Sequence, residues 1–314
     1  MKLIIGTRGS ELALAQSRWV QERLVNGKDN GVDTVELKII KTRGDKILDV
    51  ALNKVGGKGL FVKELELALL EGEVDLAVHS MKDMPSELPE GLVLGAVPER
   101  EDPRDAWVCA QTMAPKSLDE LPLGATVGTS SLRRQAHLLA RRPDLRVVPV
   151  RGNVGTRLAK LDEGRDEMLA LVLACAGLKR LNLGERITSA FSVDDMIPAV
   201  GQGALALEFR QGDTRLDAVM AQLDDPPTRW AVLAERAFLS TLEGGCQVPI
   251  GGHARVKGER LTLEGFVSSL DGTQVLRHAL EGSVHEAEKV GRLLAEHMVR
   301  QGGSEILEAG RVQV

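Results

Sequence analysis

The chain of 314 residues contains no tyrosine, and only 3% of its residues are aromatic. Proteins that bind single-stranded nucleic acid stack bases on aromatic side chains, and nucleic-acid-binding domains usually carry an excess of basic residues. The formal net charge here is −5. The shortage of aromatic residues and the net negative charge both argue against a nucleic-acid-binding protein. Any functional basic residues must therefore be concentrated in a local site.

Cysteine is scarce too, with Cys109, Cys175 and Cys246 far apart in the chain. This number and spacing match neither a disulfide framework nor a zinc site, and a reducing cytoplasm is the expected compartment. The six histidines show no metal-ligand spacing, so we expect no bound metal. No apolar run approaches the ~20 residues that span a bilayer, and residues 1–6 predict a strand rather than a signal peptide.

What remains is an ordinary soluble composition, with 43% hydrophobic and 27% charged residues. A chain of this length usually forms two or three domains. An apolar strand at 2–6 is followed by a helix with Ser10 as its N-cap, and a second strand follows at 35–41. This order predicts the opening of a parallel α/β sheet.

In α/β sheets, ligands bind beyond the carboxyl ends of the strands. Asp83 lies there because it follows an apolar strand at 74–79, although a carboxylate before a proline is equally typical of a turn. Hydroxyl groups and two arginines at 130–135 begin a helix after another strand, which favours an anion site. Solvated arginines on a helix surface are the commoner alternative. The basic residues that follow strand ends are Arg8, Arg133, Arg134, Arg151, Arg157 and Arg180.

Other segments predict the domain organisation. The charged stretch 98–105, with two prolines, is typical of a crossing between domains, and 197–204 predicts the return crossing. Cys109 and Cys175 are expected to pack inside apolar strands. The glycine-rich stretch 54–61 lacks the spacing of a phosphate loop and favours a lid whose lysines approach an anion, with a plain solvated loop as the alternative. From about residue 215 onward, a small α+β domain with an antiparallel hairpin turning at 271–272 is expected.

The segment Leu242-Glu243-Gly244-Gly245-Cys246-Gln247-Val248-Pro249-Ile250-Gly251 follows a predicted helix over 228–242. Paired glycines end helices, and they leave Cys246 in a loop that other groups can approach. A structural cysteine usually lies among apolar residues instead. From this local pattern alone, a small buried residue in a turn and a reactive thiol are about equally well supported.

This segment resembles the cofactor-attachment motif of the porphobilinogen deaminase (hydroxymethylbilane synthase) family, and His79-Ser80-Met81-Lys82-Asp83-Met84-Pro85 resembles its catalytic segment. The resemblance extends over nearly the whole chain. It implies an α/β fold with two periplasmic-binding-protein-like lobes around a cleft and a small C-terminal α+β domain with an antiparallel sheet. The implied domains are 1–99 with 200–220, 104–196, and 225–314.

The resemblance also implies the roles of individual residues. Catalytic roles fall on Asp83, Lys82 and Arg8, and a dipyrromethane cofactor is attached through a thioether to Cys246. The residues expected to bind this cofactor are Asp83, Lys82, Ser80, Thr129, Ser130, Ser131, Arg133, Arg134, Arg151 and Gly152. The residues expected to bind the substrate are Arg8, Ser10, Arg151, Arg157, Arg180 and Gln202. The residues expected in the lid are Lys54, Lys58 and Phe61.

The implied reaction is the head-to-tail condensation of four porphobilinogen molecules onto the bound dipyrromethane, with loss of ammonia, followed by hydrolytic release of hydroxymethylbilane. We expect a cytoplasmic monomer with porphobilinogen as its substrate and with no membrane or nucleic-acid partner. Nothing in the sequence demonstrates a contact with the downstream enzyme, uroporphyrinogen III synthase. The alternatives are a non-enzymatic anion receptor with two lobes and a phosphate-handling transferase; the second would need a phosphate loop that the sequence lacks.

Overall fold

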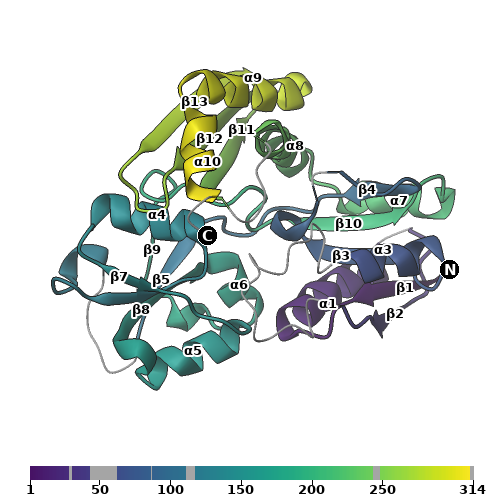
Figure 1. Ribbon diagram of the computed structural model, residues 1–314. Coiled ribbons are helices and arrows are strands. Elements are labelled where there is room, and N and C mark those ends of the chain that lie inside the picture. Colours follow the sequence, from purple (N-terminus) through teal and green to yellow (C-terminus); the bar gives the residue numbers. More distant parts are fainter. Residues whose placement is uncertain (28–29, 43–61, 86, 111–116, 243–247, 312–314) are drawn as a thin grey trace. The chain divides into compact units, whose positions relative to one another are not determined.

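The computed structural model describes residues 1–27, 30–42, 62–85, 87–110, 117–242 and 248–311 (Figure 1). Its contacts divide the chain into two compact units. Unit 1 comprises Met1–Glu101 and Ala204–Arg229, and unit 2 comprises Asp102–Gly203 and Trp230–Val314. The chain therefore leaves unit 1 near residue 101 and returns near residue 204. The three-domain boundaries given above stay a prediction.

Unit 1 contains a five-stranded sheet in the order β2-β1-β3-β10-β4. Its strands are β1 (Lys2–Thr7), β2 (Thr34–Ile39), β3 (Leu76–Ser80), β4 (Leu92–Ala96) and β10 (Leu205–Arg210). Strands β2, β1 and β3 are parallel, whereas β10 runs antiparallel to both β3 and β4. The helices are α1 (Glu11–Asn26), α3 (Lys63–Leu70) and α7 (Thr214–Leu223). Apolar side chains of all five strands and of helices α1 and α7 form the main core of this unit.

Unit 2 contains a second five-stranded sheet, in the order β7-β6-β8-β5-β9. Its strands are β5 (Asp105–Cys109), β6 (Thr126–Gly128), β7 (Arg146–Val148), β8 (Met168–Ala174) and β9 (Ser189–Ala190). Again three neighbouring strands are parallel, and β5 runs antiparallel to its neighbours β8 and β9. The helices are α4 (Leu132–Arg141), α5 (Val154–Asp162) and α6 (Cys175–Arg180).

The C-terminal part of unit 2 has an antiparallel sheet, β11-β12-β13, and its own apolar core. Its elements are α8 (Pro226–Thr241), which belongs to this unit from Trp230 onward, β11 (Ile250–Lys257), β12 (Arg260–Ser268), β13 (Val275–Ser283), α9 (Ala287–Arg300) and α10 (Gly303–Arg311). The β12–β13 turn contains Gly272 at φ +72, where a Cβ atom would lie 2.4 Å from the backbone nitrogen of Ala140 in α4. Only glycine permits this close approach, so the hairpin packs tightly on α4.

The predicted fold class is confirmed in its α/β character, with two five-stranded α/β sheets and a small α+β part built on an antiparallel sheet. Three details differ from the expectation. Each large sheet is mixed rather than parallel, because β10 and β5 run against their neighbours. Cys175 is buried as expected, but it begins α6 rather than lying in a strand. Asp105 is the first residue of β5 rather than the end of a crossing.

Candidate active site

Asp83 lies at the carboxyl end of β3, in a short 3-10 helix formed by Met81–Asp83. The backbone nitrogen of Met81 donates to the carbonyl oxygen of Ala204 at 3.0 Å, and that of Met84 donates to the Met81 oxygen at 3.1 Å. The Met81 side chain is buried, whereas Asp83 is exposed. The apolar methionine therefore anchors the turn, and the turn presents the carboxylate at the surface of unit 1.

Asp83 lines a small pocket that also includes Arg8, Ser10 and Ser80. Because β1 and β3 are parallel neighbours, their carboxyl ends meet at one edge of the sheet, and both supply residues to the pocket. The Ser10 hydroxyl caps α1 by accepting from the backbone nitrogen of Ala13 at 3.3 Å. Four residues predicted separately along the sequence therefore meet in one pocket. Lys82 lies half-buried between Met81 and Asp83.

Gln16 is a pocket residue that the sequence analysis did not identify. Its amide nitrogen donates to the Ser80 hydroxyl at 2.9 Å and so joins α1 to the end of β3. The side chain is 3% exposed and belongs to the buried stripe of α1 with Ala13, Ser17, Val20 and Leu24. The sequence does contain a signal for Gln16, because a polar amide in the buried stripe of a helix needs a hydrogen-bond partner.

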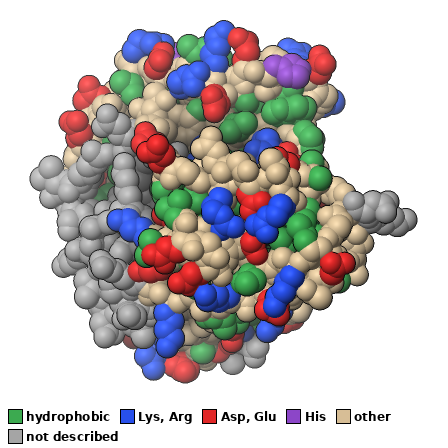
Figure 2. Space-filling view, turned by 90° about the vertical axis from the view of Figure 1, so that its right-hand side faces the viewer, with side chains coloured by type: hydrophobic (Ala, Val, Ile, Leu, Met, Phe, Trp, Pro, Cys, Tyr) green, Lys and Arg blue, Asp and Glu red, His purple; other side chains and the backbone are tan. Residues whose placement is uncertain are grey.

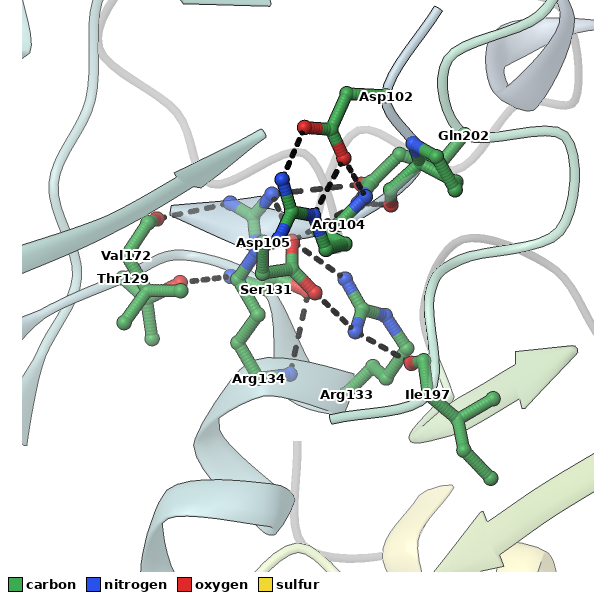
Figure 3. A network of polar contacts seen from close by, with 11 residues as sticks. Asp102, Arg104, Asp105, Thr129, Ser131, Arg133, Arg134, Val172, Ile197 and Gln202 are labelled. Atoms are coloured by element: carbon green, nitrogen blue, oxygen red, sulfur yellow. Dashed lines mark hydrogen bonds and ion pairs between the residues drawn. The ribbon is translucent and has the colours of Figure 1, made fainter. Parts of the chain in front are cut away.

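Unit 2 contains a buried ion network centred on Asp105 (Figure 3). Arg133 donates from both terminal nitrogens to the carboxylate, at 2.7 and 3.2 Å, and Arg134 donates from Nε at 2.9 Å. The Gln202 amide nitrogen donates to the same carboxylate at 3.0 Å and to the Pro103 oxygen at 2.7 Å. Three of the predicted site residues therefore share one buried aspartate as their partner.

Two guanidinium groups around one carboxylate leave this network with an excess of positive charge. Burial raises the pKa of Asp105, but the two guanidinium groups outweigh burial and hold that pKa well below its usual range. Burial also lowers the pKa of Arg134, which Asp105 opposes. The Nε atom of Arg133 is buried and makes no hydrogen bond within the described part of the chain. An additional anionic group would therefore be favourable here.

The turn that precedes α4 is held by its own hydroxyl groups. Ser131 caps the helix by accepting from the Arg134 nitrogen at 3.4 Å, and its own nitrogen donates to the Thr129 hydroxyl at 3.2 Å. The Ser130 hydroxyl donates to the Val150 oxygen at 2.8 Å, which joins the ends of β6 and β7. These contacts fix the backbone from which Arg133 and Arg134 extend.

Arg151, Gly152 and Arg157 lie around the start of α5, after β7. Gly152 has φ +114, a conformation that glycine adopts without strain. Its carbonyl oxygen accepts from Nε of Arg157 at 2.8 Å, and the Arg151 oxygen accepts from Lys160 at 2.9 Å. Because β7 and β6 are parallel neighbours, these residues follow the same edge of the sheet as Thr129.

Arg180 extends from α6, which follows β8, and donates to the Gly203 oxygen at 2.7 Å. Lys179 of the same helix binds the carboxylate of Asp102 at 2.9 Å, and Arg104 binds it at 2.8 Å. These cations lower the pKa of Asp102, Arg104 most strongly. The hydrogen bond to Gly203 joins Arg180 to the segment that contains Gln202.

Cys246 and the predicted lid residues Lys54, Lys58 and Phe61 lie outside the described residues.

Acidic and basic side chains are interspersed on the face shown in Figure 2, without a broad patch of either sign among its coloured residues. Over the ranges that the structure describes, no helix is both long and apolar enough to cross a membrane. Within the same ranges, no group of three or more metal-ligating side chains is arranged to hold a metal ion.

Comparison with known proteins gives matches over almost the entire chain. A family model described as "Porphobilinogen deaminase, dipyromethane cofactor binding domain" matches residues 3–218, and a model of the C-terminal domain of porphobilinogen deaminase matches residues 230–300. The porphobilinogen deaminase of Syntrophotalea carbinolica is 55% identical over 98% of this chain and 95% of its own length. That of Moorella thermoacetica is 51% identical over 100% and 98%, and that of Geobacter sulfurreducens is 52% identical over 98% and 94%.

Proposed function

The chain belongs to the porphobilinogen deaminase family, and from that premise we propose that it joins four porphobilinogen molecules head to tail, with loss of ammonia, and releases linear hydroxymethylbilane. In reaction class this is a transferase of tetrapyrrole and heme biosynthesis. The observation that carries the proposal is the exposed carboxylate of Asp83, which lines a pocket with Arg8, Ser10 and Ser80. An acidic pyrrole substrate offers carboxylates to Arg8, while its ring nitrogen gains positive charge that Asp83 can stabilise.

The Asp105 network fits an acidic cofactor, because it has an excess of positive charge and a buried Arg133 Nε without a partner in the described chain. When bound, dipyrromethane supplies the primer onto which porphobilinogen units are added. In unit 2 we assign its acid groups to Thr129, Ser130, Ser131, Arg133, Arg134, Arg151 and Gly152, and its thioether to Cys246. In unit 1 we assign Ser80, Lys82 and Asp83 to the cofactor.

For the substrate we assign Arg8 and Ser10 of unit 1, and Arg151, Arg157, Arg180 and Gln202 of unit 2. Lys82 and Arg8 act with Asp83 by placing cations near the acid groups of the substrate. Lys54, Lys58 and Phe61 are proposed to cover the bound substrate.

The intact mass of the purified protein tests the covalent attachment. We expect the wild-type mass to exceed the sequence mass by one dipyrromethane, and peptide mapping to place the added mass on Cys246. The Cys246→Ser variant serves as the matched control, because it keeps the shape of the side chain but cannot form the thioether. A wild-type protein without added mass would favour the non-enzymatic receptor instead.

The catalytic role of Asp83 is tested by Asp83→Asn. Removing one preorganised charge from the reacting centre typically costs about 10²–10³ in rate, so we expect kcat for porphobilinogen consumption to fall by roughly that factor. The melting temperature should stay the same, because the side chain is exposed. Glu87→Gln, at a nearby exposed carboxylate, should leave kcat unchanged. Near-normal condensation by Asp83→Asn in a single turnover would refute the role.

The compartment and the assembly state complete the proposal: a cytoplasmic monomer. Cys109 and Cys175 are both buried, and neither forms a disulfide in the described part of the chain, as suits a reducing compartment. Sedimentation velocity, run with and without uroporphyrinogen III synthase, tests the monomer and any contact with that downstream enzyme.

A further inference from the structure

Three titratable side chains lie together in unit 1 between α3 and the sheet. His79 of β3 and Glu208 of β10 form a pair, with Nε2 and Oε2 3.0 Å apart and side chains 3% and 0% exposed. They project from the same face of the sheet, because Glu208 lies opposite Ala77, two residues before His79. Glu66 of α3 is the third member and is 6% exposed. One buried oxygen of Glu66 and one of Glu208 have no hydrogen-bond partner within the described residues.

Two buried acids interact electrostatically with a single imidazole here, and one of them, Glu208, is paired with it directly. His79 can balance the charge of one carboxylate, but a second ionised carboxylate would stay uncompensated in a region of low dielectric. Burial accordingly raises the pKa of Glu66, and the negative charge of Glu208 raises it further. His79 and Lys63 oppose the shift but do not cancel it.

The described strands that pack against α3 do not supply a second positive charge to balance both carboxylates. Strand β4 contains no charged residue, and the one charged residue of β1, Lys2, pairs with Glu36 at 2.7 Å. Arg210 of β10 donates to the backbone oxygens of Leu69, in the last turn of α3, and of Val74, which follows the helix, each at 2.7 Å. A neutral Glu66 would leave one carboxylate for the one imidazole, which avoids an uncompensated charge in this buried cluster.

Glu66 is coupled to the pocket through the first turn of α3. Its backbone nitrogen donates to the oxygen of Val62 at 2.9 Å, and Val62 lines the same pocket as Asp83. His79 immediately precedes the segment 80–83 that carries Asp83, and it also lines that pocket. A change in the charge of Glu66 thus acts on two walls of the pocket at once.

We propose that Glu66 is a positioning residue that acts in its protonated form, and the inference rests on the proposed function. The neutral carboxyl group lets α3 pack against the His79–Glu208 pair, which holds Val62 and the segment 80–83 in place around the pocket. Ionisation of Glu66 sets two buried carboxylates against each other and displaces that turn of α3. Asp83 then loses its catalytic position although no residue that contacts the substrate has changed.

The first test compares the pH dependence of kcat for Glu66→Gln, Glu71→Gln and the wild-type enzyme. Glutamine has the shape of the protonated acid and cannot ionise, whereas Glu71 is an exposed glutamate at the end of the same helix. We expect the alkaline midpoint of kcat in Glu66→Gln to lie at least about one pH unit above that of the other two proteins, with KM little changed. Identical midpoints in all three proteins would overturn the proposal.

The second test is infrared spectroscopy of the holoenzyme at neutral pH, which does not depend on turnover or on the stability of a variant in assay. We expect a carbonyl stretch of a protonated carboxylic acid that titrates away on raising the pH in the wild-type and Glu71→Gln proteins and is missing in Glu66→Gln. Turnover of porphobilinogen without this band would overturn the positioning role and leave the proposed function intact. The band without any turnover would refute the proposed function, and the positioning role with it.

Discussion

In each five-stranded sheet, an antiparallel strand lies next to the third parallel strand, and it carries a buried acid. In unit 1 this is Glu208 on β10, which pairs with His79 and lies near Glu66. In unit 2 it is Asp105 on β5, which pairs with Arg133 and Arg134. The two sheets thus share one strand order, yet the cluster in unit 1 has more acids than bases and the cluster in unit 2 has more bases than acids.

The partners differ in a second respect, because a guanidinium group stays charged in a protein whereas an imidazole can lose its proton. The network in unit 2 is therefore permanently ionic and suits the binding of anions. The cluster in unit 1 can change its charge by gaining or losing protons. We infer that β5 of unit 2 and β10 of unit 1, which occupy equivalent positions in their sheets, carry different kinds of buried cluster. The cluster on β5 has a fixed charge, and the cluster on β10 has a charge that can vary.

The largest expected effect follows from removing the fixed charge of Asp105. The Asp105→Asn variant removes the protein carboxylate that the two buried guanidinium groups share, and breaking a buried pair in this way typically costs about 3–5 kcal/mol. We expect the free energy of unfolding, measured by urea titration of the holoenzyme, to fall by that amount.

The matched control is Asp119→Asn, which removes the exposed partner of Arg141 in the same unit. Exposed ion pairs contribute about 0–1 kcal/mol, so this variant should unfold close to the wild type. An equally small effect of Asp105→Asn would mean that the buried arginines find other partners, and the contrast between the units would disappear.

The second prediction concerns His137 of α4, whose ring stacks on Phe266 with centroids 3.7 Å apart. Burial, and after it the positive charge of Arg133, lowers the pKa of His137 to about 3. The folded state therefore binds this proton less readily than the unfolded state, in which histidine has its ordinary pKa of about 6.5. Stability is fully present above pH 6.5 and falls as the pH drops towards 3, by roughly 2 kcal/mol at pH 5.

Replacing His137 by phenylalanine should keep the ring stacking and remove this part of the acid sensitivity. Urea unfolding at pH 7 and pH 5 measures the difference, with His285→Phe, at an exposed histidine, as the control. The same acid dependence in His137→Phe and in the wild type would show that acid acts elsewhere. The excess positive charge of unit 2 would then not govern its response to protons.

Much of this fold follows from local sequence patterns. The apolar strand before Asp83, the Ser10 cap of α1 and the hydroxyl-rich start of α4 are all signalled by residues close together in the chain. The reversed direction of β5 and β10 is not signalled in this way, because a buried antiparallel strand has the same apolar composition as a buried parallel one. Cys175 was misplaced for a related reason, since the apolar pattern continues from β8 into α6 without a break.

The residues of the site can likewise be predicted from the sequence only where their signal is local. Arg133 and Arg134 stand out in the sequence, but Asp105, their shared partner, lies 28 residues from Arg133 in a stretch whose charges and prolines are typical of a linker. Glu208 sits in an apolar strand, and Glu66 is one of three charged residues in α3, where nothing in the sequence marks it as the buried one. Pairs of this kind depend on which strands become neighbours, and composition and periodicity do not reveal that.

The smallest expected effect comes from Glu208→Gln, the counterpart of Asp105→Asn in unit 1. The variant replaces the anionic partner of His79 with an amide whose oxygen can still accept a hydrogen bond, and an imidazole, unlike a guanidinium group, need not carry a charge. The cost is then that of a weakened buried hydrogen bond, about 1 kcal/mol, rather than that of an orphaned ion. Urea unfolding at pH 7 measures it, with Glu73→Gln, at the exposed pair with Lys38, as the control. A loss as large as that of Asp105→Asn would show that the pair in unit 1 is as strictly ionic as the network in unit 2, and the contrast between the units would be wrong.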